Sequence, residues 1–167
     1  FAFEPSKRAY KILKNNYQNN KIVLENFALS NSSKTRKFFE YDLNSQSSFY
    51  KITNNKNPFN KINKIYKIKT IKLDDYFKKI NNKIDIYKID IQGEELNVLH
   101  GMQKLLKKNK INLIKLEITI RNDYGNNRNQ FVEIVNFLKN FNYNLITISK
   151  IKFFNNEIMF MDAYFAH

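Results

Sequence analysis

The chain has 167 residues, enough for one domain with a substantial core, and 29 lysines and arginines against 15 acidic residues give a formal net charge of +14. It has no cysteine and 2 histidines far apart, which excludes a disulfide framework and a thiolate metal site and gives no reason to expect a metal. No apolar run reaches the roughly 18 residues that a membrane span needs, so no such span is expected.

The first half of the chain predicts mainly strands, over residues 1–3, 22–29, 36–43, 49–52 and 65–73. Ser6 is expected to cap a helix that ends in the Asn-rich residues 15–20. Asp74 or Asp75 is expected to cap a short helix that ends at residue 80. Residues 53–63 are rich in Asn and Lys and are expected to form a loop.

Strands and helices alternate in the second half. Strands are predicted over residues 84–91, 111–120, 143–149, 151–154 and 157–166, helices over 94–109 and 131–141, and a polar loop over 121–129. This alternation favours an α/β domain with a mostly parallel sheet over residues 1–167. The Asn155-Asn156 turn is too short for a helical crossover, so the last strand should run antiparallel to its neighbour.

Acidic residues lie at or near the ends of three predicted strands: Glu4, Asp90 and Glu117. An open α/β sheet presents its ligand site at the carboxyl ends of its strands. Asp90 is followed by a turn with Gly93 and by a helix that opens on two carboxylates. The sequence therefore predicts a ligand site at this edge, where carboxylates can accept hydrogen bonds or a proton.

Several motifs occur in a characteristic order: Phe3-Glu4-Pro5, Ala28-Leu29-Ser30, Thr70-Ile71-Lys72-Leu73-Asp74-Asp75, Lys88-Ile89-Asp90-Ile91-Gln92-Gly93-Glu94-Glu95, Leu99-His100-Gly101 and Leu116-Glu117. In order and spacing they resemble the FkbM-type S-adenosylmethionine-dependent methyltransferases over nearly all of the chain. The block that begins at Lys88 is the most specific part. The chain departs from the family at Gln92, where Glu is usual, and at His100, where Lys is common.

The resemblance implies roles for particular residues. Glu4 would accept hydrogen bonds from the two ribose hydroxyls of S-adenosyl-L-methionine, and Ala28 and Leu29 would line the adenine. Asp90 would lie beside the methionine end of the cofactor and hold its amino group, orient the acceptor hydroxyl or act as a base. The carboxylates that would face the acceptor are Glu95 and Glu117.

Each of these residues also has an ordinary structural role open to it. Glu4 and Asp90 can cap the helices that follow them, and Glu95 is a typical first-turn carboxylate. Ala28 and Leu29 can be strand-end packing, and Glu117 can be a solvated strand end.

The resemblance also implies a Rossmann-like class I methyltransferase sheet with an antiparallel last strand. In that fold a first strand and a glycine-rich loop precede the strand that ends at Glu4, and the chain contains neither. We therefore expect residues 1–167 to be the C-terminal portion of the domain, with weak cofactor binding and no efficient catalysis on its own. Without the first strand, the strands that end at Glu4 and Asp90 should have unpaired edges or pair with each other.

The leading hypothesis is a cytoplasmic enzyme that methylates a hydroxyl oxygen of a sugar, glycan or secondary metabolite. A basic nucleic-acid-binding domain is an alternative, with Phe38, Phe39, Tyr50 and Tyr66 as stacking residues. It is disfavoured because the chain has few arginines and its lysines are spread along the whole sequence. A non-catalytic scaffold with the same fold is the other alternative. The oligomeric state and the acceptor are not encoded in any motif.

Overall fold

The computed structural model describes residues 1–17, 21–42, 47–52, 61–78, 83–120 and 130–167, which form a mixed α/β structure. The strands are β1 (Ala2–Phe3), β2 (Leu24–Glu25), β3 (Ala28–Leu29), β4 (Lys34–Tyr41), β5 (Ile62–Ile71), β6 (Ile84–Ile89), β7 (Ile111–Thr119), β8 (Asn144–Phe154) and β9 (Glu157–Ala166). The helices are α1 (Lys7–Asn16), α2 (Leu73–Tyr76), α3 (Glu95–His100), α4 (Gln103–Lys107) and α5 (Phe131–Lys139).

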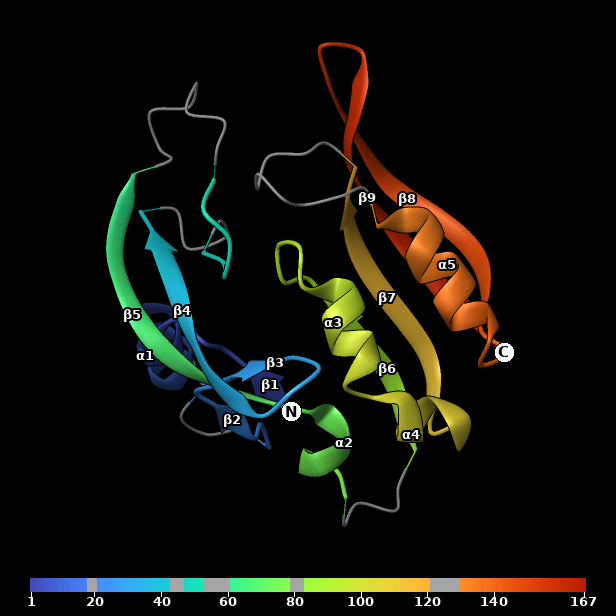
Figure 1. Ribbon diagram of the computed structural model, residues 1–167, viewed down its shortest axis with the longest axis horizontal. Coiled ribbons are helices and arrows are strands. Elements are labelled where there is room, and N and C mark those ends of the chain that lie inside the picture. Colours follow the sequence, from blue (N-terminus) through green and yellow to red (C-terminus); the bar gives the residue numbers. More distant parts are fainter. Residues whose placement is uncertain (18–20, 43–46, 53–60, 79–82, 121–129) are drawn as a thin grey trace.

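The strands form three sheets (Figure 1). β1 pairs in parallel with β2, and β5 lies between β3 and the antiparallel β4. The largest sheet has the order β6-β7-β9-β8, in which β6 and β7 are parallel and β9 is antiparallel to both of its neighbours. The predicted antiparallel last strand is therefore confirmed. In the described residues β1 and β6 do not pair with each other.

The four-stranded sheet carries the main core on one face. Helices α3, α4 and α5 lie in front of this face in Figure 1. Alternate residues of β7 point toward the helices and are fully buried, including Ile114 and Leu116, whereas Lys115 and Glu117 on the other face are partly exposed. The continuous apolar run of β7 predicted a strand buried on both faces, but only one of its faces is buried.

The Asn155-Asn156 turn explains the antiparallel pairing of β8 and β9. Both residues have positive φ angles, 49° and 64°, which asparagine tolerates better than most residues. Two left-handed residues close a tight hairpin whose twist matches that of the flanking strands. The predicted strands 143–149 and 151–154 form one strand, β8, up to this turn.

Two predicted strands of the first half were wrong. Residues 22–29 form the two short strands β2 and β3, which belong to different sheets. Between them the Asn26 side chain donates to the carbonyl oxygen of Glu4 at 2.8 Å, which fixes a turn. Residues 49–52 form no strand, because side-chain oxygens of Ser48 and Tyr41 accept the amides of Tyr50 and Ile52. Of the predicted loops, residues 53–60 and 121–129 lie outside the described residues, Lys61 is in neither a helix nor a strand, and Ile62 and Asn63 belong to β5.

The predicted helix 94–109 was also wrong, because it is broken into α3 and α4 at Gly101. A Cβ at Gly101 would overlap the carbonyl oxygen of Ser30, so only glycine allows this approach of two backbones. The Gly101 carbonyl in turn accepts the amide of Asp74 at 3.0 Å. Contacts with two distant segments therefore break the helix.

Candidate active site

The turn between β6 and α3 is held by side chains beneath it. Gln92 and Gly93 have positive φ angles of 52° and 98°. Glu95 is buried, and its Oε1 accepts the amides of Ile91 and Gly93 at 3.3 and 3.2 Å. From the other side, the Ser48 hydroxyl donates to the carbonyl oxygen of Gln92 at 2.9 Å. The turn is thus fixed in a strained conformation that the free chain would rarely adopt.

Burial raises the pKa of Glu95 to about 7, although the two loop amides act in the opposite direction. The charge of nearby Asp90 adds to the rise. The structure therefore gives Glu95 a role in positioning the turn. Its predicted contact with the substrate stays a prediction.

Asp90 and Glu117 lie together at the carboxyl ends of β6 and β7. The Gln92 amide nitrogen lies 3.4 Å from Asp90 Oδ1 and 3.5 Å from Glu117 Oε1, so it bridges the two carboxylates. The Asp90 side chain is 32% exposed and also pairs with Lys88 at 2.9 Å. Because a neutral amide is the group that can donate to both acids, Gln92 suits this position better here than the usual Glu would.

The pKa of Glu117 is raised, first by burial and then by the charges of Asp90 and Asp162. Asp162 lies opposite Glu117 in the β7–β9 register and is itself buried. Its charge is compensated by Lys115 at 2.8 Å and by the more distant Lys150 at 3.7 Å. Asp90, Glu117 and Asp162 thus form a row of carboxylates on the face of the sheet away from the helices. Of these, Glu117 holds a proton more readily than a free glutamate does.

Glu4 lies directly after β1, in a different sheet from Asp90. Its Oε1 accepts the Ser6 amide at 2.7 Å, and the Ser6 hydroxyl caps α1 as predicted. Burial raises the pKa of Glu4 against the effect of the Ser6 amide, and the charge of Glu40 raises it further. The side chain is therefore a partly buried acceptor at a strand tip.

Ala28 and Leu29 lie on β3, which pairs with β5. Ala28 is buried against Phe38 and Ile68, and Leu29 packs against the main core. Both residues therefore pack at the end of a strand, which was the alternative role considered for them. Their contact with adenine stays a prediction.

An ion pair that the sequence did not predict, between Arg36 of β4 and Glu94, stabilises the start of α3. Arg36 on β4 donates from both of its terminal nitrogens to Glu94, at 2.5 and 3.0 Å, and the Glu94 side chain is 1% exposed. The Ser30 hydroxyl donates to the same carboxylate at 3.1 Å. Arg36 also lies 4.0 Å from the ring centroid of Phe49. No local sequence signal links Arg36 to Glu94, which are 58 residues apart.

Among the described residues, no three or more His, Asp and Glu side chains gather in a way that could hold a metal ion. No helix in the same part of the chain is long and apolar enough to cross a membrane.

Comparison with known protein families decides which family this arrangement comes from. The family model described as the methyltransferase FkbM domain matches residues 1–145. The chain belongs to the FkbM methyltransferase family. The matched region of this FkbM domain contains Glu4, Asp90 and Glu117 and ends at the start of β8. No curated protein and no solved structure matches the chain.

Proposed function

We propose that this FkbM domain transfers a methyl group from S-adenosyl-L-methionine to a hydroxyl oxygen of a small molecule or glycan, in the cytoplasm. The observation that carries the proposal is the paired arrangement of Asp90 and Glu117 around Gln92 within a chain of this family. The cofactor would supply an activated methyl group. The protein would supply orientation, exclusion of water and a place for the proton.

The side chains present fit the polar parts of the cofactor. Glu4 is acceptor-only when ionised, and one Ser6 amide does not exhaust its acceptor capacity, so it can accept both ribose hydroxyls. Asp90 is partly exposed and can accept from the amino group of the methionine moiety. The order β6-β7-β9-β8 with an antiparallel β9 supports the class I Rossmann-like sheet in which such tips form one site.

The acceptor hydroxyl must lose its proton as the methyl group arrives. Asp90 and Glu117 share the Gln92 amide, and the raised pKa of Glu117 favours proton uptake at neutral pH over that of an ordinary glutamate. We assign orientation of the hydroxyl to Asp90 and acceptance of its proton to Asp90 or Glu117. The fixed turn beneath them keeps both carboxylates in place.

One experiment separates the two roles. Binding of S-adenosylhomocysteine is measured by saturation-transfer NMR, and transfer of labelled methyl is measured on a panel of hydroxyl-bearing sugars and glycans. Glu4→Gln should weaken binding about tenfold through loss of charge-assisted hydrogen bonds. Asp90→Asn keeps an oxygen that can accept from the amino group of the cofactor, so it should weaken binding by at most about tenfold. It should lower transfer by about 100-fold, the usual contribution of a positioned base, and thus by more than it lowers binding.

Matched controls are Glu25→Gln, which also changes an acid in the first sheet, and Asp85→Asn, which changes an exposed acid of β6. Neither should alter binding or transfer. If S-adenosylhomocysteine gave no signal with the wild-type chain, or if Glu4→Gln bound it equally well, the assigned cofactor site would be wrong. Equal transfer by Asp90→Asn would remove Asp90 from the reaction.

A further inference from the structure

The hairpin of β8 and β9 projects beyond the rest of its sheet. β7 pairs with β9 only as far as Thr119 and Phe160, whereas β8 and β9 continue to pair up to Phe154 and Glu157. Figure 1 shows this end of the hairpin standing out at the carboxyl end of β7. We call residues 150–158 the hairpin tip. Because β6 and β7 are parallel, the hairpin tip lies at the same edge of the sheet as Asp90 and Glu117.

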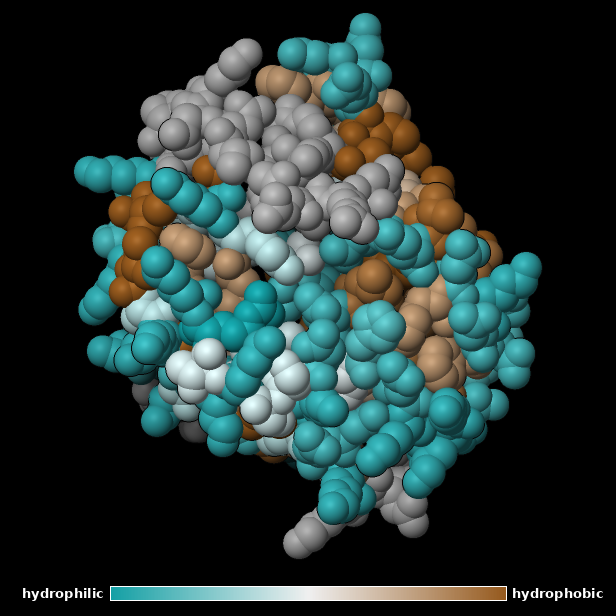
Figure 2. Space-filling model, viewed as in Figure 1, coloured by the Kyte–Doolittle hydropathy of each residue, from teal (hydrophilic) through white to brown (hydrophobic). Residues whose placement is uncertain are grey.

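The hairpin tip exposes large apolar side chains. Phe153 is 61% exposed, Phe154 52% and Ile151 41%. Apolar exposure continues down β8, where Ile146 is 57% exposed. Hydrophobic residues gather on the right-hand side of Figure 2, where β8 and β9 lie in Figure 1. On soluble proteins, an exposed apolar patch of this kind commonly marks an interaction surface.

An apolar groove of 440 Å³ continues from the hairpin tip along β8. Ile158 of the hairpin tip, Ile146 and Ile148 of β8, and Ile120 and Phe131 lie on its walls. Thr147 is the polar residue of this lining. The groove therefore offers aliphatic surface to the same partner that meets the tip.

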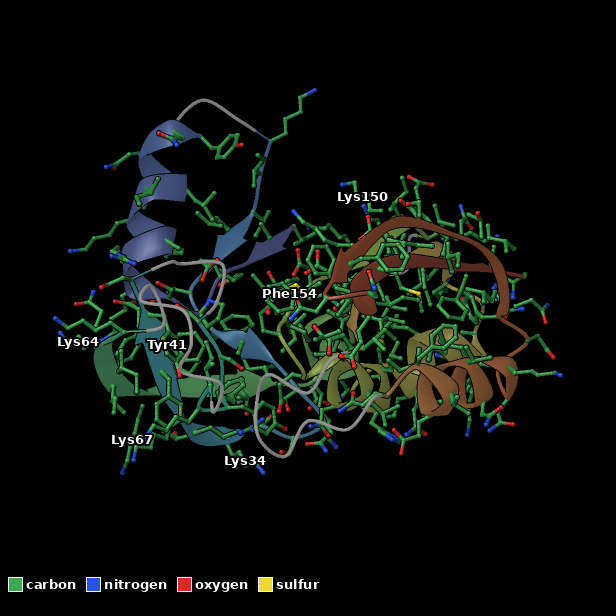
Figure 3. The ribbon with its side chains drawn as sticks, turned by 90° about the horizontal axis from the view of Figure 1, so that it is seen from above. Lys34, Tyr41, Lys64, Lys67, Lys150 and Phe154 are labelled. Atoms are coloured by element: carbon green, nitrogen blue, oxygen red, sulfur yellow. The ribbon has the colours of Figure 1, made fainter. Side chains whose placement is uncertain are left out.

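Positive charge alternates with these apolar residues. Lys150 and Lys152 flank Ile151, against the single acid Glu157 in the hairpin tip. Lys150 has a positive φ of 48° at an irregularity in the β8–β9 pairing. Its Nζ lies 3.7 Å from Asp162 Oδ2, a carboxylate with which Lys115 pairs more closely at 2.8 Å, and the Lys150 side chain is still 71% exposed. Figure 3 shows that Lys150 and Phe154 both belong to this hairpin, while Lys64 and Lys67 lie at the opposite side of the molecule.

We propose that the hairpin tip docks this protein on an anionic lipid bilayer, with the phenylalanines in the headgroup boundary and the two lysines on lipid phosphates. Aromatic and aliphatic side chains flanked by lysines are the composition that binds such an interface. A second copy of the chain fits less well, because both partners would bring a net charge of +14 and the same two lysines. A nucleic acid fits less well because most of the exposed apolar residues along β8 are aliphatic and because β8 and β9 contain no arginine for phosphate recognition.

The contact with lipid does not depend on methyl transfer. Docking would turn the carboxyl edge of the sheet, with Asp90 and Glu117, toward the membrane. The methyl acceptor would then be a lipid-linked glycan or a lipid headgroup. Only this inference about the acceptor rests on the proposed function.

Vesicle sedimentation of the complete chain tests the proposal without cofactor. The vesicles contain phosphatidylcholine alone or with about 30% phosphatidylserine, at about 0.1 M salt. The chain should bind the anionic vesicles and not the neutral ones. Lys150→Glu with Lys152→Glu should weaken this binding at least tenfold. Lys64→Glu with Lys67→Glu makes the same change in net charge on β5 and should keep binding within about threefold.

A second pair of variants tests the apolar part. Phe153→Ser with Phe154→Ser should lose binding, whereas Ile86→Ser with Val132→Ser, which are 64% and 63% exposed on other elements, should retain it. Circular dichroism melts exclude unfolding, and the lysine variants carry the test if the phenylalanine variants do not fold. If both lysine pairs lost vesicle binding equally, binding would depend on the net charge of the protein and not on the hairpin tip, and the proposal would be wrong. No vesicle binding, together with self-association that the phenylalanine variants abolish, would show that the surface meets a second copy instead.

Discussion

At the scale of single residues, Glu95 shows how a motif residue can act through the backbone. Its carboxyl is buried beneath the turn, and its pKa is raised from 4.5 to about 7. The resemblance in the Lys88–Glu95 block singled out Glu95 as a substrate contact, and that role stays a prediction. The sequence did not show which way the side chain points, because a first-turn carboxylate has the same pattern whether it faces solvent or folds back under its own loop.

The raised pKa makes stability depend on pH at this residue. A glutamate that holds its proton more tightly in the folded state contributes full stability below about pH 4.5 and loses it as the pH rises through 7. Glu95→Gln is neutral at every pH. We therefore expect its free energy of unfolding, relative to wild type, to increase by on the order of 2 to 3 kcal/mol between pH 5 and pH 8.

Urea unfolding of both chains at the two pH values measures this difference. Glu133→Gln on the exposed side of α5 is the control and should change little with pH. If the free energies of unfolding of Glu95→Gln and wild type differed by the same amount at pH 5 and pH 8, Glu95 would be ionised over this whole range in the folded protein.

At the scale of elements, patterns within a strand or helix were predictable and contacts between elements were not. Alternation of apolar and polar residues predicted β4 and β5, and apolar residues at helical spacing predicted α5. Asp74 or Asp75 was expected to cap a short helix, but Lys72 is the N-cap of α2 and both acids lie in its first turn. The Asp74 carboxylate instead accepts the amides of Lys104 and Leu105 at 2.9 and 3.0 Å, at the start of α4.

The ion pair between β4 and α3 is the element contact with the largest expected effect. Arg36→Met leaves the Glu94 carboxylate buried at 1% exposure without its bidentate partner. Loss of one member of such a pair costs about 3 to 5 kcal/mol. We expect Arg36→Met to lower the free energy of unfolding by that amount in urea denaturation.

Arg8→Met is a suitable comparison because Arg8 donates to the neutral carbonyl oxygens of Tyr41 and Asp42, and it should cost about 1 kcal/mol. The double variant Arg36→Met with Glu94→Met should recover part of the loss, since no buried charge remains. A loss below about 1 kcal/mol for Arg36→Met would mean that water or another cation compensates Glu94.

At the scale of the whole molecule, the two-residue turn at Asn155 was enough to predict an antiparallel final strand. The division into three sheets was not predictable in detail. Strand pairing depends on which edges meet, and short strands such as β2 and β3 carry too few residues to show alternation. Two outcomes were expected for β1 and β6, unpaired edges or pairing with each other, and the first is observed: in the described residues β1 pairs with β2 alone and β6 with β7 alone, so each has one unpaired edge.

The net charge of +14 gives a last prediction at this scale. The lysines are spread over the surface, so they repel one another in the folded state more than in the expanded chain. Salt shortens the screening length from about 30 Å at 0.01 M to about 8 Å at 0.15 M and so weakens this repulsion. We expect sodium chloride over that range to stabilise the protein by about 1 kcal/mol at pH 7, a rise of roughly 2 to 4 °C in Tm.

Thermal melts followed by circular dichroism at pH 7 and at pH 9.8 measure the effect. At pH 9.8, the calculated isoelectric point, the net charge vanishes and the rise should vanish with it. The buried pair of Arg36 and Glu94 is screened little by salt and should not oppose the trend. An equal rise at both pH values would assign the stabilisation to salting-out of apolar surface, which includes the exposed face of β8, and not to charge repulsion.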